Sequence, residues 1–310
     1  MNRHSLTVVG LLVGSMIFPT FCSHAQEVPK DYQAVVTILG KKGEYKDNVL
    51  KINIPRNDLS VTVAGVQTPT PFGFGGWLAL TKGDNGIDVM MGDLVLLEEE
   101  VNPVMSALLV NGIEVTALHN HFFWEAPRVF YMHVHGHGTP GELAEKVKPA
   151  LALIGKGSPP DPGGSKGLNT SSVQMVEGKL NTEKLKAIIG HGGELNGPVY
   201  KVTIGRDDLV IKEMGAVINA RMGLNTWAAF IGTDENAAVA GDFAMKEDEV
   251  QSVLQALRKN GLDIVAIHHH MIGSRPVIIF LHYWGAGPAE NLAKGFRAAL
   301  DQLGPVSPGK

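Results

Sequence analysis

Nine histidines of this chain fall in two short blocks, and their residue type and spacing suit metal binding. The blocks comprise His119, His121, His133, His135 and His137, and then His268, His269, His270 and His282. Both blocks share one pattern, in which an H-x-H triplet is followed, after a turn, by a third histidine. Three converging imidazoles are the ligand set of a His₃ metal centre.

The spacing predicts that three imidazoles of each block lie on one face of a β-hairpin. Residues two apart on a strand point to the same face, and directly opposed residues of an antiparallel pair share it. With the turn centred near residue 126, His119 lies opposite His133, and His121 lies diagonal to it. An open fourth position would hold water or substrate, and the metal would lower the pKa of that water toward about 7. Imidazoles without thiolate suit zinc, copper, nickel or iron, and zinc or copper is the expected cofactor.

A structural role for the same histidines is the main alternative, because half-buried imidazoles at strand ends can hydrogen-bond and hold a hairpin turn. Met132 and Met271 near the histidines raise a third reading, a haem or copper redox site. Methionines are more often core filler than ligands, so this third reading is the weakest.

The two blocks differ where the first is richer in histidine. His135 and His137 of the first copy correspond to Trp284 and Ala286 of the second. The first block is therefore the expected active site, and the second block is expected to be a degraded copy that serves as a scaffold. Alternatively, both hairpins face one shared cleft.

Few carboxylates are candidates for acid–base work beside a metal. Glu125 lies in the turn of the first hairpin, where it would serve as general base to a metal-bound water, or would be a solvated turn residue. Other acidic and basic positions recur in both copies, and helix capping and helix-dipole contacts explain the acids at 93, 100, 242 and 249. The segments 56–59 and 206–209 form either a turn with local ion pairs, which is the favoured reading, or a surface anion site. These recurring pairs are Asp93 and Asp242, Glu100 and Glu249, Arg56 and Arg206, and Asp58 and Asp208.

An internal duplication organises the whole chain. The string ILGKKGE at 38–44 returns as IIGHGGE at 188–194, and Lys51 and Trp77 return as Lys201 and Trp227, all at a spacing of 150 residues. We expect two homologous domains, at 30–154 and 175–305, joined by a Gly/Pro-rich linker at 155–174. Two similar halves often pack about a pseudo-two-fold axis.

The hydrophobic pattern of one copy predicts the elements that position the histidines. Helices are expected at 32–39, 98–110 and 142–154, and strands at 49–54, 60–66, 77–81, 87–97, 113–121 and 128–135. This order predicts an α+β domain in which an antiparallel-rich sheet carries its helices on one face.

Composition excludes several classes of protein. Hydrophobic residues make up 44% of the 310 residues and charged residues 19%, which is a globular balance. The net charge of -4 gives no general attraction to nucleic acid. No G-x-S-x-G elbow, P-loop or dinucleotide fingerprint occurs in a suitable context, and no stretch after the first residues is long and apolar enough for a transmembrane segment.

The first 25 residues read as a signal peptide. A basic start at Arg3 and His4 precedes an apolar run over 6–18, then Pro19 and a small-x-small cleavage site ending at Ala25. We expect a periplasmic or secreted protein whose mature chain has no cysteine, which excludes disulfides and thiolate sites. Cys22 raises the alternative of a lipid anchor, but Phe21 stands where a lipidation site needs a small residue.

Three strings of the first copy resemble the LppY/LpqO family, which is built on the domain of unknown function DUF1259. They are GDLVLLEEEVNPVM at 92–105, TALHNH at 116–121 and MHVHGHG at 132–138. The resemblance covers nearly all of the chain after the signal peptide and implies an exported bacterial protein with a duplicated domain. It implies no reaction and no catalytic residues.

Two functions compete at this point. The first is an exported metal-binding protein, and more narrowly a metal-dependent hydrolase, centred on the paired histidine hairpins. The second is a non-enzymatic ligand-binding or envelope-stress protein with structural histidines, whose partner is an unknown small molecule or envelope component.

Overall fold

The computed structural model of the chain describes residues 26–156 and 179–304. The expected signal peptide and most of the expected linker lie outside these residues. None of the helices in the two described ranges is long and apolar enough to cross a membrane.

The first repeat forms one six-stranded antiparallel sheet with three helices. Its main sheet has the order β1-β2-β5-β6-β9-β7, and a small sheet has the order β4-β3-β8. The elements are α1 (Lys30–Leu39), β1 (Gly43–Lys46), β2 (Val49–Pro55), β3 (Val61–Val63), β4 (Val66–Thr68), η1 (Thr70–Phe72), β5 (Gly75–Lys82), η2 (Asp84–Gly86), β6 (Asp88–Leu97), α2 (Glu98–Val110), β7 (Glu114–His119), β8 (Glu125–Ala126), β9 (Val129–Gly138) and α3 (Pro140–Leu151).

The second repeat has the same architecture. Its six-stranded sheet has the order β10-β11-β14-β15-β17-β16, which matches the first sheet strand for strand. The elements are α4 (Thr182–Ile189), β10 (Glu194–Asn196), β11 (Val199–Gly205), β12 (Ile211–Glu213), β13 (Ala216–Ile218), η3 (Ala220–Met222), β14 (Asn225–Gly232), β15 (Ala237–Lys246), α5 (Val250–Lys259), β16 (Asp263–His268), β17 (Ile278–Gly287) and α6 (Ala289–Leu300). The predicted α+β class, with helices on one face of each sheet, is confirmed.

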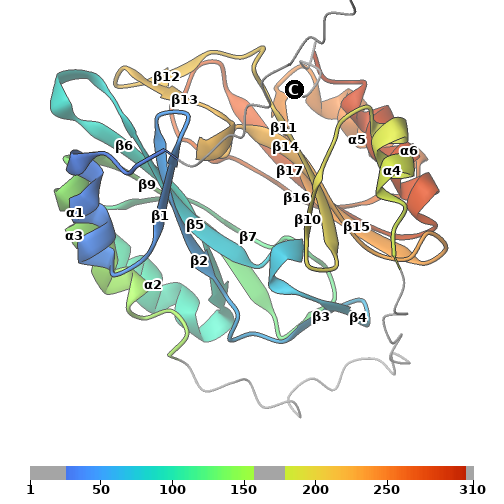
Figure 1. Ribbon diagram of the computed structural model, residues 1–310, viewed down its shortest axis with the longest axis horizontal. Helices are drawn as coiled ribbons and strands as arrows, with labels where there is room; N and C mark the ends of the chain where they lie inside the picture. The colour runs from blue at the N-terminus through green and yellow to red at the C-terminus, as the bar shows by residue number, and fades with distance from the viewer. Residues whose placement is uncertain (1–25, 157–178, 305–310) are drawn as a thin grey trace, which may run out of the picture.

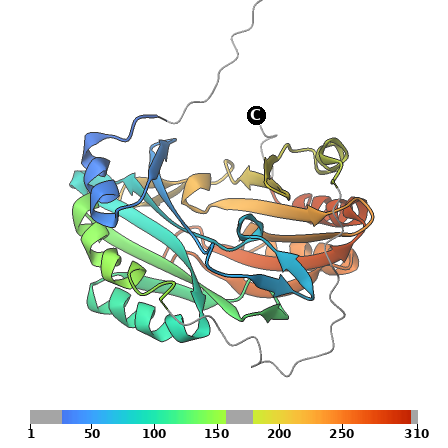
Figure 2. The same cartoon turned by 60° about the horizontal axis from the view of Figure 1, so that its bottom comes forward.

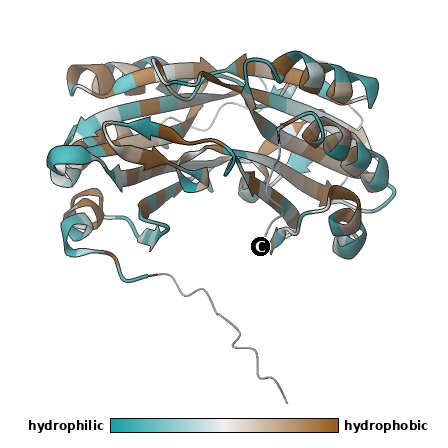
Figure 3. Ribbon diagram, turned by 90° about the horizontal axis from the view of Figure 1, so that it is seen from above, coloured by the Kyte–Doolittle hydropathy of each residue, from teal (hydrophilic) through white to brown (hydrophobic). Residues whose placement is uncertain are grey.

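The two sheets face each other, and the helices cover the outer faces (Figures 1 and 2). Separate apolar cores lie between each sheet and its own helices, whereas two further apolar clusters combine residues of both repeats. Apolar stretches therefore run along the strands of both sheets (Figure 3). All ten residues of β6 are buried, because helices cover one face of this central strand and the opposite sheet covers the other.

Strand alternation divides the histidine strands between these two environments. On β9, Met132 and Val134 face the helices of their own repeat, whereas Tyr131 joins the core between the sheets. His133 shares the face of Tyr131, since residues two apart on a strand point the same way. The histidines of each hairpin therefore point toward the other repeat.

One predicted strand is wrong. The segment 60–66 was expected as a single strand, but it is divided between β3 and β4, which form a tight hairpin. Ala64 and Gly65 make the turn with φ of 48° and 82°, values that interrupt an extended strand.

Candidate metal centre

Each sheet carries a row of four inward-facing side chains that ends at a histidine. In the first repeat, Asn53 pairs with Trp77, Trp77 with Asp93, and Asp93 with His133, across β2, β5, β6 and β9. The corresponding row of the second repeat is Thr203, Trp227, Asp242 and His282. Paired residues of antiparallel strands share a face, so the two rows look at each other across the space between the sheets.

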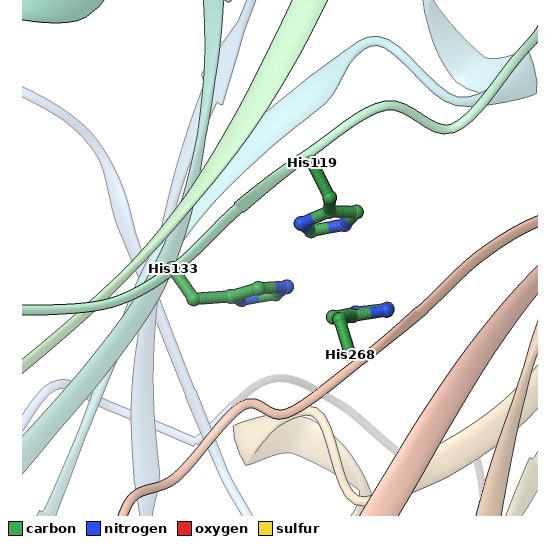
Figure 4. Close-up of side chains that lie close together, drawn as sticks. All are labelled: His119, His133 and His268. Carbon is green, nitrogen blue, oxygen red and sulfur yellow. The ribbon is translucent and has the colours of Figure 1, made fainter.

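Six histidines, three from each repeat, meet where these rows end. They are His119, His121 and His133, and His268, His270 and His282. We call them the six-histidine cluster. Figure 4 shows three of its members converging from strands of both halves.

The closest ring pairs of the cluster all join the two repeats. The ring centroids of His119 and His268 lie 3.8 Å apart. His121 lies 3.6 Å from His282, and His133 lies 3.9 Å from His270. The second and third distances are nearly equal, as a pseudo-two-fold relation that exchanges these two pairs requires, and the first pair maps onto itself. The H-x-H triplet of each repeat thus meets the third histidine of the other repeat.

The predicted register of the first hairpin is wrong by two residues. His119 pairs with Tyr131, and Ala117 is the residue opposite His133. The connection between the strands contains β8, and a bulge lies between Val115 and Ala117, so a simple turn centred at residue 126 does not apply. The histidines still share the inward face, but the three of one repeat are not the closest set.

Three groups in the cluster bring potential ligand atoms within 4.8 Å of one another, and each could hold a metal ion. They are His119, His121 and His282; His119, His133 and His268; and Asp242, His268 and His270. Two of the three groups draw on both repeats. Of the two arrangements considered from the sequence, the structure has the shared cleft.

The nitrogens of the cluster are buried and largely without hydrogen bonds. Eight ring nitrogens, distributed over all six histidines, have no hydrogen-bond partner within the described residues. Buried polar atoms are normally paired, so such a concentration indicates a site built for a ligand. Nε2 of His268 lies 3.2 Å from Nε2 of His270. Two nitrogens bound to one tetrahedral zinc at about 2.0–2.1 Å lie about 3.3 Å apart, so this spacing fits a chelating pair.

Backbone contacts orient the third histidine of each repeat. Nδ1 of His282 donates to the carbonyl of Gly241 at 3.1 Å, and His133 makes the corresponding contact with the carbonyl of Gly92. Nε2 of both rings is unpartnered among the described residues. A backbone acceptor on one ring nitrogen leaves the other as a lone pair aimed into the cluster, as in metal-ligating histidines.

Burial keeps the cluster neutral. It lowers the pKa of all six histidines, and for His133 and His282 the pKa falls to about 3. Neutral imidazole is the form that binds metal, so these rings need lose no proton at neutral pH.

Asp93 and Asp242 flank the cluster in a symmetric way. Oδ2 of Asp93 lies 4.0 Å from Nε2 of His121, and Oδ2 of Asp242 lies 3.7 Å from Nε2 of His270. Burial raises the pKa of both carboxyls, that of Asp93 to about 7. Their expected capping role is wrong, because both lie within strands and face the other sheet.

The other recurring acids behave as expected, and the alternative of a surface anion site is wrong because Arg56 and Arg206 are buried and paired with carboxylates. Glu100 accepts a hydrogen bond from the backbone nitrogen of Leu97 at the start of α2 and pairs with the buried Arg56 at 2.6 Å. Glu249 does the same for Arg206 at 2.8 Å in the second repeat.

A cavity of about 660 Å³ adjoins the cluster and is lined by both repeats. Five side chains of the first repeat that line the cavity recur unchanged in the lining from the second repeat. They are Lys51, Trp77, Asp93, His121 and His133, with Lys201, Trp227, Asp242, His270 and His282. Candidate metal ligands, carboxyls and cations therefore face one shared cavity.

Comparison with known proteins identifies the family. The sequence profile described as Domain of Unknown Function (DUF1259) matches residues 33–153 and again residues 183–302. The chain belongs to the DUF1259 family. The two matches also support the duplication.

Other comparisons with this DUF1259 chain are distant. No curated protein matches it. Among solved structures, the trimeric bacterial microcompartment shell protein PduB is 9% identical with a TM-score of 0.19, over 82% of this chain and 86% of that one. EtuB from Clostridium kluyveri is 9% identical with a TM-score of 0.20, over 84% and 90%. Scores this low carry no argument about the DUF1259 chain.

His135 and His137 lie outside the six-histidine cluster. Their Nε2 atoms donate to the two carboxylate oxygens of Glu213, at 2.9 Å and 3.0 Å. Glu213 belongs to β12 of the other repeat, so the three residues form a link between the halves. The same three also form a fourth group whose ligand atoms could hold a metal ion.

Glu125 also lies apart from the cluster. It sits on β8, pairs with Val63 of β3, and accepts a hydrogen bond from Nδ2 of Asn120 at 3.2 Å. It is not among the residues that line the cavity. Its role as general base stays a prediction without geometric support.

Four pairs of cavity residues were not predicted as site residues. Asp93, Lys51 and Trp77 stand out in the sequence only because each recurs in the second copy, and Asn53 does not stand out at all. The two-residue alternation of their strands was the available signal, since it places Lys51 and Asn53 on one face of β2 and Trp77 on the same face of β5.

Proposed function

We propose that this DUF1259 chain binds a transition metal, zinc or copper, in the six-histidine cluster, with ligands from both repeats. The observation that carries the proposal is the set of eight buried ring nitrogens without a partner within the described residues. Histidines that only braced a hairpin would have their nitrogens paired with nearby protein groups. Imidazole ligands without thiolate suit both metals.

The arrangement of the ligands allows one or two ions per chain. His119, His121 and His282 form one complete set, and Asp242, His268 and His270 form another without sharing a residue with it. A bound metal would act as a Lewis acid and lower the pKa of a coordinated water toward about 7.

A metal-dependent hydrolase is the narrower form of this proposal. Asp93 supports it, because this carboxyl faces the cavity beside His121 and has a pKa of about 7. A group with that pKa can accept and return a proton at neutral pH. We include in the same proposal that the protein is exported to the periplasm and that it belongs to the LppY/LpqO group within the DUF1259 family.

Elemental analysis of the full chain, purified without a histidine tag, tests the metal centre. We expect one or two equivalents of a single transition metal, lost in the double variant His119→Ala/His268→Ala. His269→Ala is the matched control, because His269 belongs to the same block but is exposed.

A wild-type protein that is purified without metal and takes up neither zinc nor copper would overturn the proposal. The alternative, a ligand-binding or envelope-stress protein with structural histidines, would then gain support if small molecules raised the unfolding temperature.

A further inference from the structure

Two lysines related by the duplication project into the cavity. Nζ of Lys51 lies 4.6 Å from the ring centroid of Trp77, and Nζ of Lys201 lies 4.1 Å from that of Trp227. Both lysines line the cavity and are half-buried. Neither makes a salt bridge or a hydrogen bond to a side chain within residues 26–156 and 179–304.

Unlike the two lysines, the buried arginines of the same sheets are each paired with carboxylates. Arg56 is bound by Asp58 and Glu100, and Arg206 is bound by Asp208 and Glu249. A cation–π contact contributes less free energy than the cost of taking an ammonium group out of water. The tryptophans alone therefore do not compensate Lys51 and Lys201.

Three cations line the cavity, and one of them has a carboxylate partner. Arg221 pairs with Glu44 at 3.3 Å, whereas Lys51 and Lys201 make no such pair among the described residues. Burial raises the pKa of the two carboxyls of the described lining, Asp93 and Asp242, which favours their neutral forms. Burial, and then the nearness of Lys201 and Arg221, lowers the pKa of Lys51 to about 8, as expected for cations that share one cavity.

The remaining walls suit a small organic molecule. The indole rings of Trp77 and Trp227 supply apolar surface, and Asn53 and Thr203 supply hydrogen-bonding groups. A volume of about 660 Å³ lies in the range of small-molecule sites and is too small for a macromolecule.

We propose that the cavity binds a small organic anion, whose carboxylate or phosphate group lies between Lys51 and Lys201 and whose carbon body lies against the two indole rings. This anion site deepens the proposed function. Only the idea that the bound anion is the substrate of an adjacent metal centre rests on that proposed function. An oxyanion supplies the charge-assisted hydrogen bonds that the two ammonium groups lack.

Calorimetric titration of the full chain with malonate, phenyl phosphate and inorganic phosphate tests the proposal. We expect malonate or phenyl phosphate to bind, and the double variant Lys51→Met/Lys201→Met to bind it about tenfold or more weakly. Methionine keeps the apolar stem of lysine. Lys51→Arg/Lys201→Arg should retain binding, and Lys259→Met, at an exposed position outside the cavity, is the matched control.

Metal content measured on the same samples separates the two proposals. Loss of anion binding with unchanged metal supports the lysine site, and anion binding by a metal-free wild type supports it even if the metal centre fails. Equal affinity of wild type and the methionine variant would overturn the lysine site, since the anion would then be held by a metal or elsewhere. Failure of the wild type to bind any of the three probes would also overturn it.

Discussion

β9 carries one histidine of the six-histidine cluster, His133, and the two histidines outside it, His135 and His137, and their ring nitrogens differ in what they contact. Nε2 of His133 has no partner within the described residues, whereas Nε2 of His135, two residues further on, donates to Glu213. His137 donates to the other oxygen of the same carboxylate. Both groups face the second repeat, and both lie where the halves meet.

The difference contrasts candidate ligand nitrogens that lack a protein partner with nitrogens that already contact a carboxylate. A carboxylate already satisfies His135 and His137, so these residues can hold β9 to β12 without further help. The second repeat has Trp284 and Ala286 at the matching positions, so this link exists on one side only. The six-histidine cluster, by contrast, takes three histidines from each repeat, and eight of its ring nitrogens have no hydrogen-bond partner within the described residues.

The largest expected effect comes from removing histidines of different repeats that share one metal. His121→Ala and His282→Ala should each weaken zinc affinity by more than about 100-fold, because their rings meet in one ligand group. His135→Ala should leave the affinity of the cluster unchanged. A competition titration against a chromophoric zinc chelator measures all three. If His282→Ala retained full affinity while His121→Ala lost it, the ligands would be confined to one repeat.

Acid should destabilise the metal-free chain through the cluster. The histidines take up protons near pH 6.5 when unfolded, but His133 and His282 do so only near pH 3 when folded. Between these values the unfolded chain binds more protons, so stability falls as the pH falls, by about 1.4 kcal/mol per pH unit for each such histidine.

Asp93, with its pKa raised to about 7, has the opposite effect and offsets part of this loss. Unfolding temperatures of the metal-stripped wild type and of His133→Asn/His282→Asn, from pH 7.5 to pH 4, isolate the histidine contribution. The variant should show the flatter profile, and parallel profiles would contradict the expectation.

A smaller effect is expected where the histidines already have a partner. Glu213→Gln weakens the contacts to His135 and His137 and should lower the free energy of unfolding by about 1–2 kcal/mol. Metal content should stay at the wild-type level. Chemical denaturation with elemental analysis measures both, and Glu235→Gln, at an exposed position, is the control. Loss of metal in Glu213→Gln would show that this group is itself a metal site.

The smallest effect is expected at Glu125. Glu125→Gln should change neither metal content nor stability by more than about 0.5 kcal/mol, because glutamine can still accept the hydrogen bond from Asn120. If a hydrolytic activity is found, this variant should retain it while Asp93→Asn loses it. The reverse result would restore Glu125 as the general base.

Much of the fold could be predicted because its signals are local. The strand expected at 87–97 is β6 (Asp88–Leu97), and the helix expected at 98–110 is α2 (Glu98–Val110). The strand at 60–66 failed because a turn at Ala64 and Gly65 carries no strong sequence mark. The hairpin register failed because a connection containing β8 cannot be reduced to a simple turn.

The sequence by itself determined the duplication, the strands that carry the histidines and the common face on which they lie. Period-two alternation and a spacing of 150 residues are properties of the chain alone. Only the tertiary structure decided which histidines meet, that Asp93 and Asp242 flank them, and that Lys51 and Lys201 make no salt bridge within the described part of the chain. These contacts join residues of different repeats, and they depend on how two sheets pack face to face, which no periodicity within one repeat encodes.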